Sequence, residues 1–323
     1  MPGPAARQRR FAPTGLNPGR GDAVRWCHSS AKETSRRDNI LTTQRSILIT
    51  GCSSGIGLCV AHGLQQRGWR VFASARQADD VARLLAAGLE ALQLDVDDSL
   101  SIYAAVASVT ARCGGRLDAL FNNAGYGQPG AVEDIPREAL RAQFETNLFG
   151  AWELTNAVLP LMRKQGAGRI LFNSSVLGFA AMPFRGAYNA SKFAMEGMAD
   201  TLRLELAGSG IEVALIEPGP IISHFRANAA ARFHKYITAT SSVHHQAYAA
   251  MQARLDKVGP AAPFTLPPEA VLQAVIHALE SRRPRARYRV TTPTRVFAVA
   301  KRLLSTRLLD KLLLLSVRDE RQR

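Results

Sequence analysis

Tyr188 and Lys192 combine side-chain types and a spacing that suit proton transfer, because they stand four positions apart in the stretch Tyr-Asn-Ala-Ser-Lys. At that separation two side chains lie on the same face of a helix. A phenol has a pKa of about 10 and is a poor base at neutral pH, but a nearby ammonium group favours the phenolate and lowers that pKa. The pair could then exchange a proton with an alcohol or carbonyl oxygen. The spacing also occurs in helices without such a role, so it needs support from other motifs.

A glycine-rich turn, TGCSSGIG at 50–57, follows a short apolar run and precedes a helical pattern. Gly51 allows a tight turn out of a strand, Gly55 lets the backbone approach a pyrophosphate, and Gly57 lets helix and strand pack closely. The spacing G-x-x-x-G-x-G differs from the commoner dinucleotide pattern G-x-G-x-x-G. Taken alone, the turn is also compatible with a loop that merely needs flexibility.

The end of the next strand indicates which dinucleotide would bind. An acidic residue about twenty positions after the turn would bind a ribose 2′-hydroxyl and favour NAD. Here the strand ends in Ala-Ser-Ala-Arg, and Arg76 could bind a 2′-phosphate through charge-assisted hydrogen bonds, with the Ser54 hydroxyl adding a further one. The sequence therefore predicts NADP(H), with NAD less favoured. The alternative is that Arg76 simply faces solvent.

Strand-like and helix-like segments alternate from residue 46 onward. The predicted strands are 47–50, 71–74, 90–94, 119–122, 170–174 and 213–217, and the predicted helices between them are 56–67, 100–112, 137–164 and 190–207. Such alternation predicts a parallel sheet covered on both faces, with right-handed crossovers. We expect a single α/β domain with a doubly wound, Rossmann-like sheet over 45–293.

Three further segments are assigned from composition. Residues 220–268 lack regular periodicity and read as a substrate lid, after which Pro267-Pro268-Glu269 opens a helix and 287–291 could form a last strand. Residues 1–44 are rich in Pro, Gly, Arg and Ser and are expected to be a disordered extension, with a transit peptide or a misassigned start codon as alternatives. Residues 294–323 form a basic, Leu-rich helical tail with a break expected at Ser305-Thr306.

Charge is concentrated at the two ends of the chain. The net charge of +15 divides into +5 for residues 1–44, +10 for residues 281–323 and zero for the middle. A nucleic-acid-binding protein needs a basic stripe on its folded face, so we expect no nucleic-acid partner. The tail could instead contact an anionic membrane surface, or could serve as a flap over the pocket or an oligomer contact.

Composition and residue spacing argue against a membrane-spanning, a disulfide-linked and a metal-binding protein. No apolar run is long enough to span a membrane, and the four cysteines (Cys27, Cys52, Cys59 and Cys113) have no C-x-x-C spacing. We expect a reducing compartment and a cytoplasmic protein, with a peripheral position at a membrane as the alternative. The histidines of the lid have no acidic partner at ligand spacing, so no metal site is expected.

Four motifs in one order resemble the short-chain dehydrogenase/reductase family, in its compact single-domain branch. They are Gly51-x-x-x-Gly55-x-Gly57, the run Asn122-Asn123-Ala124-Gly125, Ser175 thirteen residues before Tyr188, and Pro218-Gly219. The resemblance extends from about residue 46 to 223.

The resemblance implies a role for each matching residue. Tyr188 would be the general acid/base, Lys192 would lower its pKa and hold the nicotinamide ribose, and Ser175 would hydrogen-bond the substrate oxygen. Asn147 would support a proton-relay water, although it could also be a helix residue bonded to a carbonyl. The implied cofactor contacts are Gly51, Ser53, Ser54, Gly55, Ile56, Gly57, Arg76, Asp95, Val96, Asn123, Ala124, Gly125, Tyr188, Lys192, Pro218, Gly219 and Ser223, where the family usually has Thr at the last position.

The expected function is that of an oxidoreductase transferring hydride between NADP(H) and an apolar carbonyl or alcohol substrate, such as a steroid, a retinoid or an aliphatic aldehyde or ketone. Aromatic residues in the lid suggest an apolar pocket, although they could equally be packing residues. The alternatives are a dinucleotide-sensing binding protein and a sugar-nucleotide epimerase or dehydratase on a related fold. A homo-oligomer is expected by analogy with the family.

Overall fold

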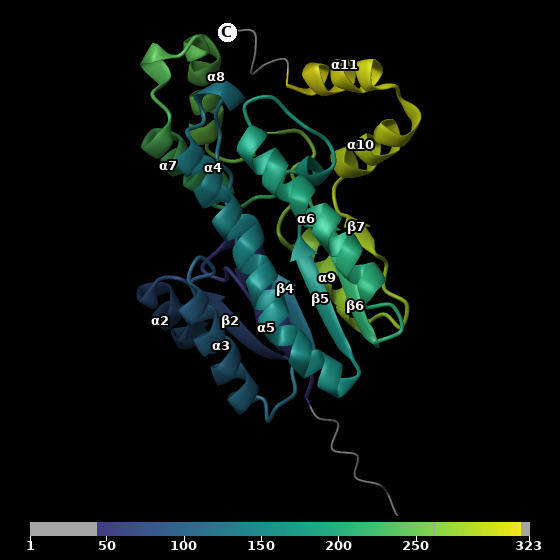
Figure 1. The fold of residues 1–323 in the computed structure, drawn as a ribbon. Helices are drawn as coiled ribbons and strands as arrows, with labels where there is room; N and C mark the ends of the chain where they lie inside the picture. The colour runs from purple at the N-terminus through teal and green to yellow at the C-terminus, as the bar shows by residue number, and fades with distance from the viewer. Residues whose placement is uncertain (1–43, 261, 318–323) are drawn as a thin grey trace, which may run out of the picture. The chain divides into compact units, whose positions relative to one another are not determined.

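The computed structural model describes residues 44–260 and 262–317, and at its centre is a seven-stranded parallel sheet (Figure 1). The strand order is β3-β2-β1-β4-β5-β6-β7. Chain order therefore runs outward from β1 in both directions, which is the doubly wound, Rossmann-like arrangement that the sequence predicts. The strands are β1 (Ser46–Ile49), β2 (Arg70–Ala75), β3 (Glu90–Gln93), β4 (Ala119–Asn122), β5 (Gly168–Asn173), β6 (Ile211–Glu217) and β7 (Arg287–Arg289).

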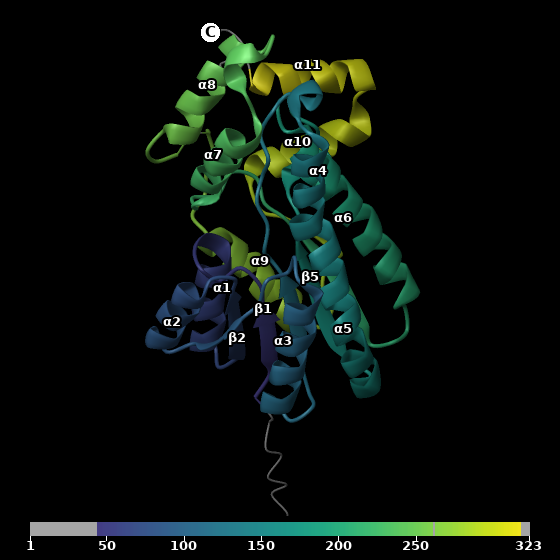
Figure 2. The ribbon, with the colours of Figure 1, turned by 60° about the vertical axis from the view of Figure 1, so that its left-hand side comes forward.

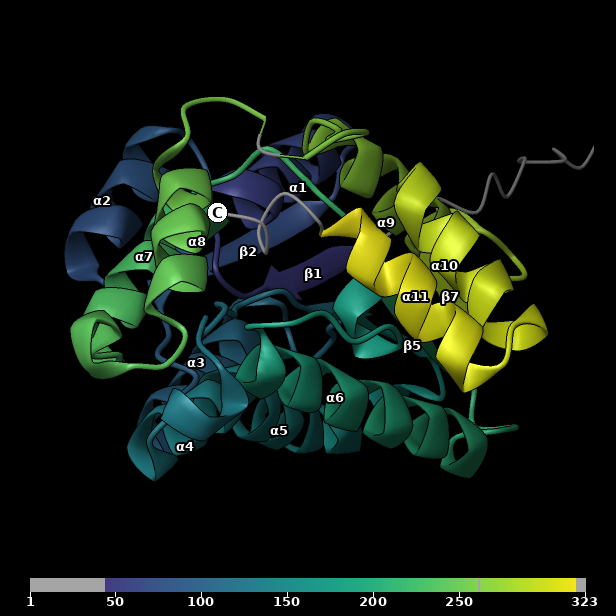
Figure 3. The same cartoon turned by 90° about the horizontal axis from the view of Figure 1, so that it is seen from above.

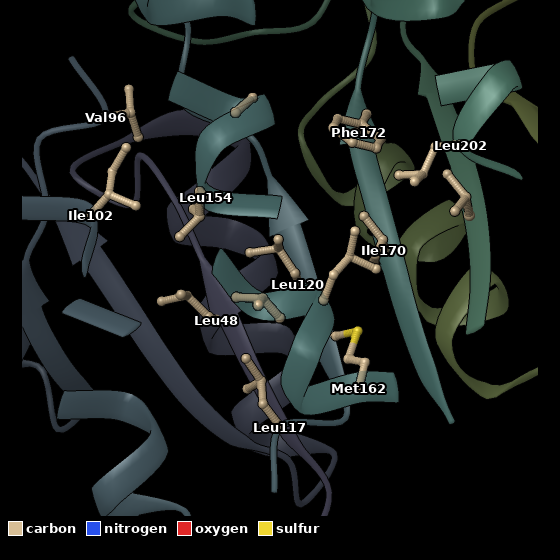
Figure 4. Packing of buried hydrophobic residues seen from close by; sticks show 14 of the residues in the cluster. Leu48, Val96, Ile102, Leu117, Leu120, Leu154, Met162, Ile170, Phe172 and Leu202 are labelled. Carbon is tan, nitrogen blue, oxygen red and sulfur yellow. The ribbon is translucent and has the colours of Figure 1, made fainter. Parts of the chain in front are cut away.

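Helices cover both faces of the sheet (Figure 3). One face packs on α1 (Gly55–Gln66), α2 (Ala78–Ala86) and α9 (Glu269–Glu280). The other packs on α3 (Ser99–Arg112), α5 (Gly150–Gln165) and α6 (Gly186–Glu205). Because successive side chains of a strand point to opposite faces, Leu48 packs on the second face while Ile47 and Ile49 pack on the first. Figure 4 shows Leu48, Leu120 and Ile170 together with Leu154 and Met162 of α5.

The predicted elements differ from the observed ones in several places. Helix α2 is not among the predicted helices, although its sequence is amphipathic and Leu84 and Val81 pack on the core. The predicted helix 137–164 is present as α4 (Arg137–Phe144) and α5, but a π-helical turn, η2 (Glu145–Phe149), separates the two. Helix α6 begins four residues before its predicted start.

The lid segment 220–268 is more regular than expected. It contains α7 (Phe225–Tyr236), the short turn η4 (Ala239–Ser241) and α8 (His245–Asp256). These elements share a small apolar cluster that includes Phe233, Tyr248 and Met251. The expectation of an irregular segment is therefore wrong, since the low amphipathicity of these two helices conceals their shared core.

The basic tail forms two helices, α10 (Thr292–Leu303) and α11 (Thr306–Ser316), separated close to the predicted break. Both the α7–α8 pair and the α10–α11 pair lie at the carboxyl end of the sheet (Figures 1 and 2). Of the N-terminal extension predicted over 1–44, all but Gln44 lies outside the described residues. In the described part of the chain, no helix is long and apolar enough to cross a membrane.

Candidate active site

A cleft of about 2470 Å³ opens at the carboxyl ends of the strands, where ligands bind in open parallel sheets. Its walls come from the segments that follow β1 to β6 and from the helices of the lid and the tail. Two of the predicted site residues, Gly57 and Asn147, do not line it. The others do: Gly51, Ser53, Ser54, Gly55, Ile56, Arg76, Asp95, Val96, Asn123, Ala124, Gly125, Ser175, Tyr188, Lys192, Pro218, Gly219 and Ser223.

The glycine-rich turn connects β1 to α1 and needs glycine for two different reasons. Gly51 and Gly55 have φ of +70° and +58°, a backbone region that L side chains rarely adopt. Gly57 is required for close packing, because a Cβ there would lie 2.3 Å from the carbonyl oxygen of Gly51. The role predicted for Gly57, close approach of helix and strand, explains why it does not line the cleft.

Asn123, which directly follows the neighbouring strand β4, stabilises this turn through hydrogen bonds. Its Nδ2 donates to the carbonyl oxygens of Thr50 (2.8 Å) and Gly51 (3.1 Å), and the amides of Asn123 and Ala124 both donate to Thr50 Oγ1 at 2.9 Å. The start of α1 has no acidic residue in its first turn, and Ser54 makes no side-chain capping bond to the described residues. The amides of that turn therefore suit an anionic group, and the chain fits the pyrophosphate of a dinucleotide.

The end of the cleft beside β2 and β3 carries the residues expected at the adenosine. Arg76 follows β2 directly, is exposed and lines the cleft. Asp95 follows β3, where its Oδ1 accepts the amide of Asp97 at 3.1 Å and its own amide donates to Ser101 Oγ at 3.0 Å. These bonds hold the Asp95–Val96 loop in place. Arg76 is exposed at this end of the cleft, where it could meet a 2′-phosphate.

Ser175 and Tyr188 lie together at the other end of the cleft. Ser175 begins the short turn η3 (Val176–Gly178), and its Oγ accepts the amide of Leu177 at 3.1 Å. Tyr188 lies near the start of α6, and burial raises its pKa to about 12, although a hydrogen bond with the Ser175 side chain opposes the rise. The two hydroxyls can therefore both form hydrogen bonds with the same substrate atom.

Lys192 is buried one turn after Tyr188, with its Nζ 5.9 Å from the centroid of the Tyr188 ring. Its Nζ donates to the carbonyl oxygen of Asn173 at 2.6 Å, and burial lowers its pKa to about 7. The sequence suggests that this ammonium lowers the pKa of Tyr188, but the pKa of Tyr188 is raised. The physical reason is desolvation, which disfavours the charged form of both side chains and which sequence spacing does not reveal.

Asn147 lies in the π-helical turn η2 and is fully buried, outside the cleft wall. Its Nδ2 donates to the Tyr126 carbonyl oxygen (3.0 Å) and to Ser191 Oγ (3.1 Å), while its Oδ1 accepts the Tyr126 amide (3.0 Å). It therefore ties the segment after β4 to helix α6 next to Lys192. Short π-helical turns inside helices are frequent at functional sites. Its role with a proton-relay water stays a prediction.

The tail contributes Phe297, Leu312 and Val317 to the wall, in line with the flap over the pocket that the sequence offers as one alternative. One contact in the cleft is missed by sequence reasoning. Phe225, the first residue of α7, packs edge-on against the Tyr188 ring with centroids 5.4 Å apart. Leu309, Leu312 and Leu313 at helical spacing were the available signal for a buried face of α11, and no local signal paired Phe225 with Tyr188. Among the described residues, no group of His, Cys, Asp or Glu is placed to hold a metal ion.

Comparison with known proteins gives the family. Residues 45–232 match the family described as short chain dehydrogenase. The chain belongs to the short-chain dehydrogenase/reductase family. The resemblance expected from the four motifs is thereby confirmed, and the chain is an NAD(P)-dependent oxidoreductase of this family.

Relatives of this short-chain dehydrogenase/reductase differ in how much of their length they share with it. It is 43% identical over 283 residues to the uncharacterized oxidoreductase YbbO of Escherichia coli (strain K12), which covers 87% of this chain and 99% of the relative. It is 40% identical over 191 residues to 17-beta-hydroxysteroid dehydrogenase type 1 of Homo sapiens, covering 55% of this chain and 57% of the relative. Among solved structures, a variant of actinorhodin polyketide ketoreductase with NADPH is similar, with a TM-score of 0.63 and 31% identity, covering 76% of this chain and 95% of that one.

Proposed function

We propose that this short-chain dehydrogenase/reductase transfers hydride between NADP(H) and an apolar carbonyl or alcohol substrate. The observation that carries the proposal is the placement of the Ser175 and Tyr188 hydroxyls together in a cleft whose nearby wall is apolar. The wall residues that argue for an apolar substrate are Val176, Leu177, Met182, Phe225, Phe297 and Leu312. A steroid, a retinoid or an aliphatic aldehyde or ketone would suit such a wall, and one relative is named as a hydroxysteroid dehydrogenase.

The protein would bind and orient the cofactor through three groups of residues. The glycine-rich turn from Gly51 and the start of α1 would hold the pyrophosphate. Arg76 would hold the 2′-phosphate, with the Ser54 hydroxyl as a second donor. When bound, the cofactor supplies or accepts the hydride. The remaining contacts would be Asp95 and Val96 at the adenine, Asn123, Ala124 and Gly125 along the dinucleotide, and Pro218, Gly219 and Ser223 near the nicotinamide.

In the reductive direction, the substrate oxygen would accept hydrogen bonds from Ser175 and Tyr188. Ser175 Oγ accepts the amide of Leu177, and its own proton, which it can donate to Tyr188, would be donated to the substrate oxygen when substrate is bound. Donors placed where negative charge develops lower the barrier. Tyr188 would transfer its proton to that oxygen, and Lys192, charged below about pH 7 according to its lowered pKa, would stabilise the phenolate left behind. Phe225 against the Tyr188 ring would exclude water from the reacting atoms.

The first test is steady-state oxidation of NADPH, with NADH in parallel, across ketosteroids, retinal and medium-chain aldehydes. We expect a higher kcat/KM with NADPH for the preferred substrate. Arg76→Ala is expected to lower kcat/KM for NADPH by about 10- to 100-fold, because one charge-assisted contact is lost, and to leave that for NADH nearly unchanged.

Arg163→Ala serves as the matched control, since Arg163 is an exposed arginine in the last turn of α5 and does not line the cleft. Equal use of NADPH and NADH by the unchanged chain would contradict the NADP proposal. Epimerisation of a sugar nucleotide without net NADPH consumption would support one alternative, and dinucleotide binding without turnover would support the other. The names of the reported relatives favour the oxidoreductase over both.

We further propose that the exposed faces of α10 and α11 contact an anionic membrane surface. These faces carry Val299, Leu303, Leu308 and Leu315, all at least half exposed. Arg302, Arg307 and Lys311 are exposed beside them, without a charged partner among the described residues. Apolar side chains flanked by cations suit an interface with anionic lipid. The opposite side of α11 lines the cleft, so an apolar substrate could enter from that surface.

Flotation with phosphatidylserine vesicles tests this contact. The full chain is expected to float with anionic vesicles and not with neutral ones, and replacing Arg302, Arg307 and Lys311 by Glu is expected to abolish flotation, because electrostatic attraction to the lipid reverses. Replacement of Arg163 and Lys164 by Glu is the control. Equal flotation of all variants, or none of the unchanged chain, would contradict the membrane contact. Association through these faces in sedimentation velocity would instead identify an oligomer contact.

The oligomeric state and the cellular location of the protein are also proposals. The homo-oligomer rests on analogy with the family alone. The cytoplasmic location fits the free thiols of Cys52, Cys59 and Cys113, as found in a reducing compartment.

A further inference from the structure

A partly buried cluster of charged side chains lies between helix α6 and strands β6 and β7, and the proposed function assigns it no role. Glu196 and Asp200 come from α6, Glu217 ends β6, and Arg287 and Arg289 come from β7. Glu217 is fully buried and Glu196 is only 6% exposed. Isolated buried carboxylates are costly, so their retention needs an explanation.

Arg287 connects the three carboxylates of this cluster. Its Nη1 donates to Glu217 Oε1 at 2.7 Å and also to Glu196 Oε2, and its Nη2 donates to Asp200 Oδ2 at 2.5 Å. Burial nevertheless raises the pKa of Glu217 to about 7 and lowers the pKa of Arg287. Desolvation therefore offsets much of the attraction, and a buried ion pair of this kind is weak evidence for stability. The geometry points instead to a role of the cluster in positioning neighbouring residues.

The cluster is connected to the proposed catalytic residues through Ser174, which directly precedes Ser175 in the chain. Ser174 Oγ donates to Glu196 Oε1, whose other oxygen is the one that pairs with Arg287. The Ser174 amide donates to the Ile216 carbonyl oxygen, and the Val176 amide donates to the Pro218 carbonyl oxygen, each at 2.8 Å. Ser175 is thus held between two anchored neighbours.

The same carboxylate also fixes the distance to the helix that carries the acid/base. Glu196 stands one turn after Lys192 and two turns after Tyr188 on α6. The turn η3 packs directly on the Ser174–Glu196 contact, since a Cβ at Gly178 would lie 2.6 Å from Ser174 Oγ and 2.9 Å from Glu196 Cγ. Movement of Glu196 would therefore shift the turn that carries Ser175 relative to α6.

We propose that Glu196 is a positioning residue for catalysis: held by Arg287, it anchors Ser174 and thereby sets the Ser175 hydroxyl relative to that of Tyr188. The inference rests on the proposed function in that these two hydroxyls act on the same substrate oxygen. Misplacing reacting groups by about 1 Å can cost about 100-fold in rate, so even a small shift is measurable.

The test uses Ser174→Ala and Glu196→Gln in the full chain. Ser174→Ala removes one hydroxyl and leaves every ion pair in place, while Glu196→Gln retains an acceptor for Ser174 but removes the charge that pairs with Arg287. We expect kcat to fall about tenfold or more in Ser174→Ala, with less loss in Glu196→Gln, and the dissociation constant for NADPH to stay within about twofold. Ser174→Thr, which keeps a hydroxyl, should restore most of kcat.

Hydrogen exchange gives a readout that is independent of substrate. The amides of Val176, Leu177 and Gly178 all donate within this turn and its neighbours, and we expect them to exchange faster in Ser174→Ala while the strands keep their protection. Glu205→Gln, at the exposed end of α6, is the matched control.

Unchanged kcat and unchanged exchange in both variants would overturn the proposal. Faster exchange throughout the sheet would also overturn it, because the cluster would then only stabilise the fold. If the unchanged chain reduces none of the carbonyl compounds, the proposed function fails, but local exchange in the turn still decides whether Glu196 positions Ser175.

Discussion

Replacing Tyr188 with Phe is expected to lower kcat by about a thousandfold or more while NADPH binding changes by less than about twofold. The substitution removes only the hydroxyl that would transfer a proton to the substrate oxygen. The ring remains, so its edge-on contact with Phe225 at 5.4 Å is retained. Ser175 and Lys192 keep their own hydrogen bonds to Leu177 and Asn173. Stopped-flow turnover together with a fluorescence titration of NADPH separates the two effects.

Tyr126→Phe is the matched control, because Tyr126 is also a tyrosine of the cleft wall but has no proposed part in the chemistry. It should keep activity within about threefold, as expected for a change outside the reacting groups. Full turnover in Tyr188→Phe would remove the proposed acid/base. Loss of both turnover and NADPH binding would show that the hydroxyl maintains the shape of the cleft.

Replacing Gly57 with Ala is expected to weaken NADPH binding by about 100-fold and to lower the free energy of unfolding by about 1–3 kcal/mol, as overpacking does elsewhere. The new Cβ would lie 2.3 Å from the Gly51 carbonyl oxygen and 2.6 Å from Asn123 Nδ2. The first of these atoms belongs to backbone, so α1 must move away from the turn. That movement would displace the amides expected to bind the pyrophosphate. Calorimetric titration with NADPH and thermal unfolding measure the two consequences.

Gly197→Ala provides the opposite case on the same protein. Gly197 lies in α6, and a Cβ there would meet nothing within 4 Å. Alanine favours a helix over glycine by up to about 1 kcal/mol, so this variant should be as stable as the unchanged chain or more so, with normal NADPH binding. Normal binding by Gly57→Ala would show that the turn is a flexible loop, which is the alternative left open by its sequence.

Patterns that lie within a single strand, turn or helix could be recognised in the sequence. The continuous apolar run around Leu48, the glycines of the turn after it and the four-residue spacing of Tyr188 and Lys192 all describe neighbours along a strand, a turn or a helix. The parallel, doubly wound sheet then follows from the alternation of strands and helices. The pair α7–α8 was hidden because its helices are weakly amphipathic and pack around a small core of their own, whereas α2 was missed although its sequence is amphipathic.

The sequence by itself determined the fold class, the order of the motifs and the side chains that could carry the chemistry, because local spacing decides which residues share a face or a turn. Tertiary structure alone decided how those side chains behave. Burial raises the pKa of Tyr188 and lowers that of Lys192, Asn147 bonds to the segment after β4, and Arg287 reaches Glu196 from 91 positions away. Desolvation and contacts between distant elements depend on what surrounds a side chain after packing, and neither is written in the spacing along the chain.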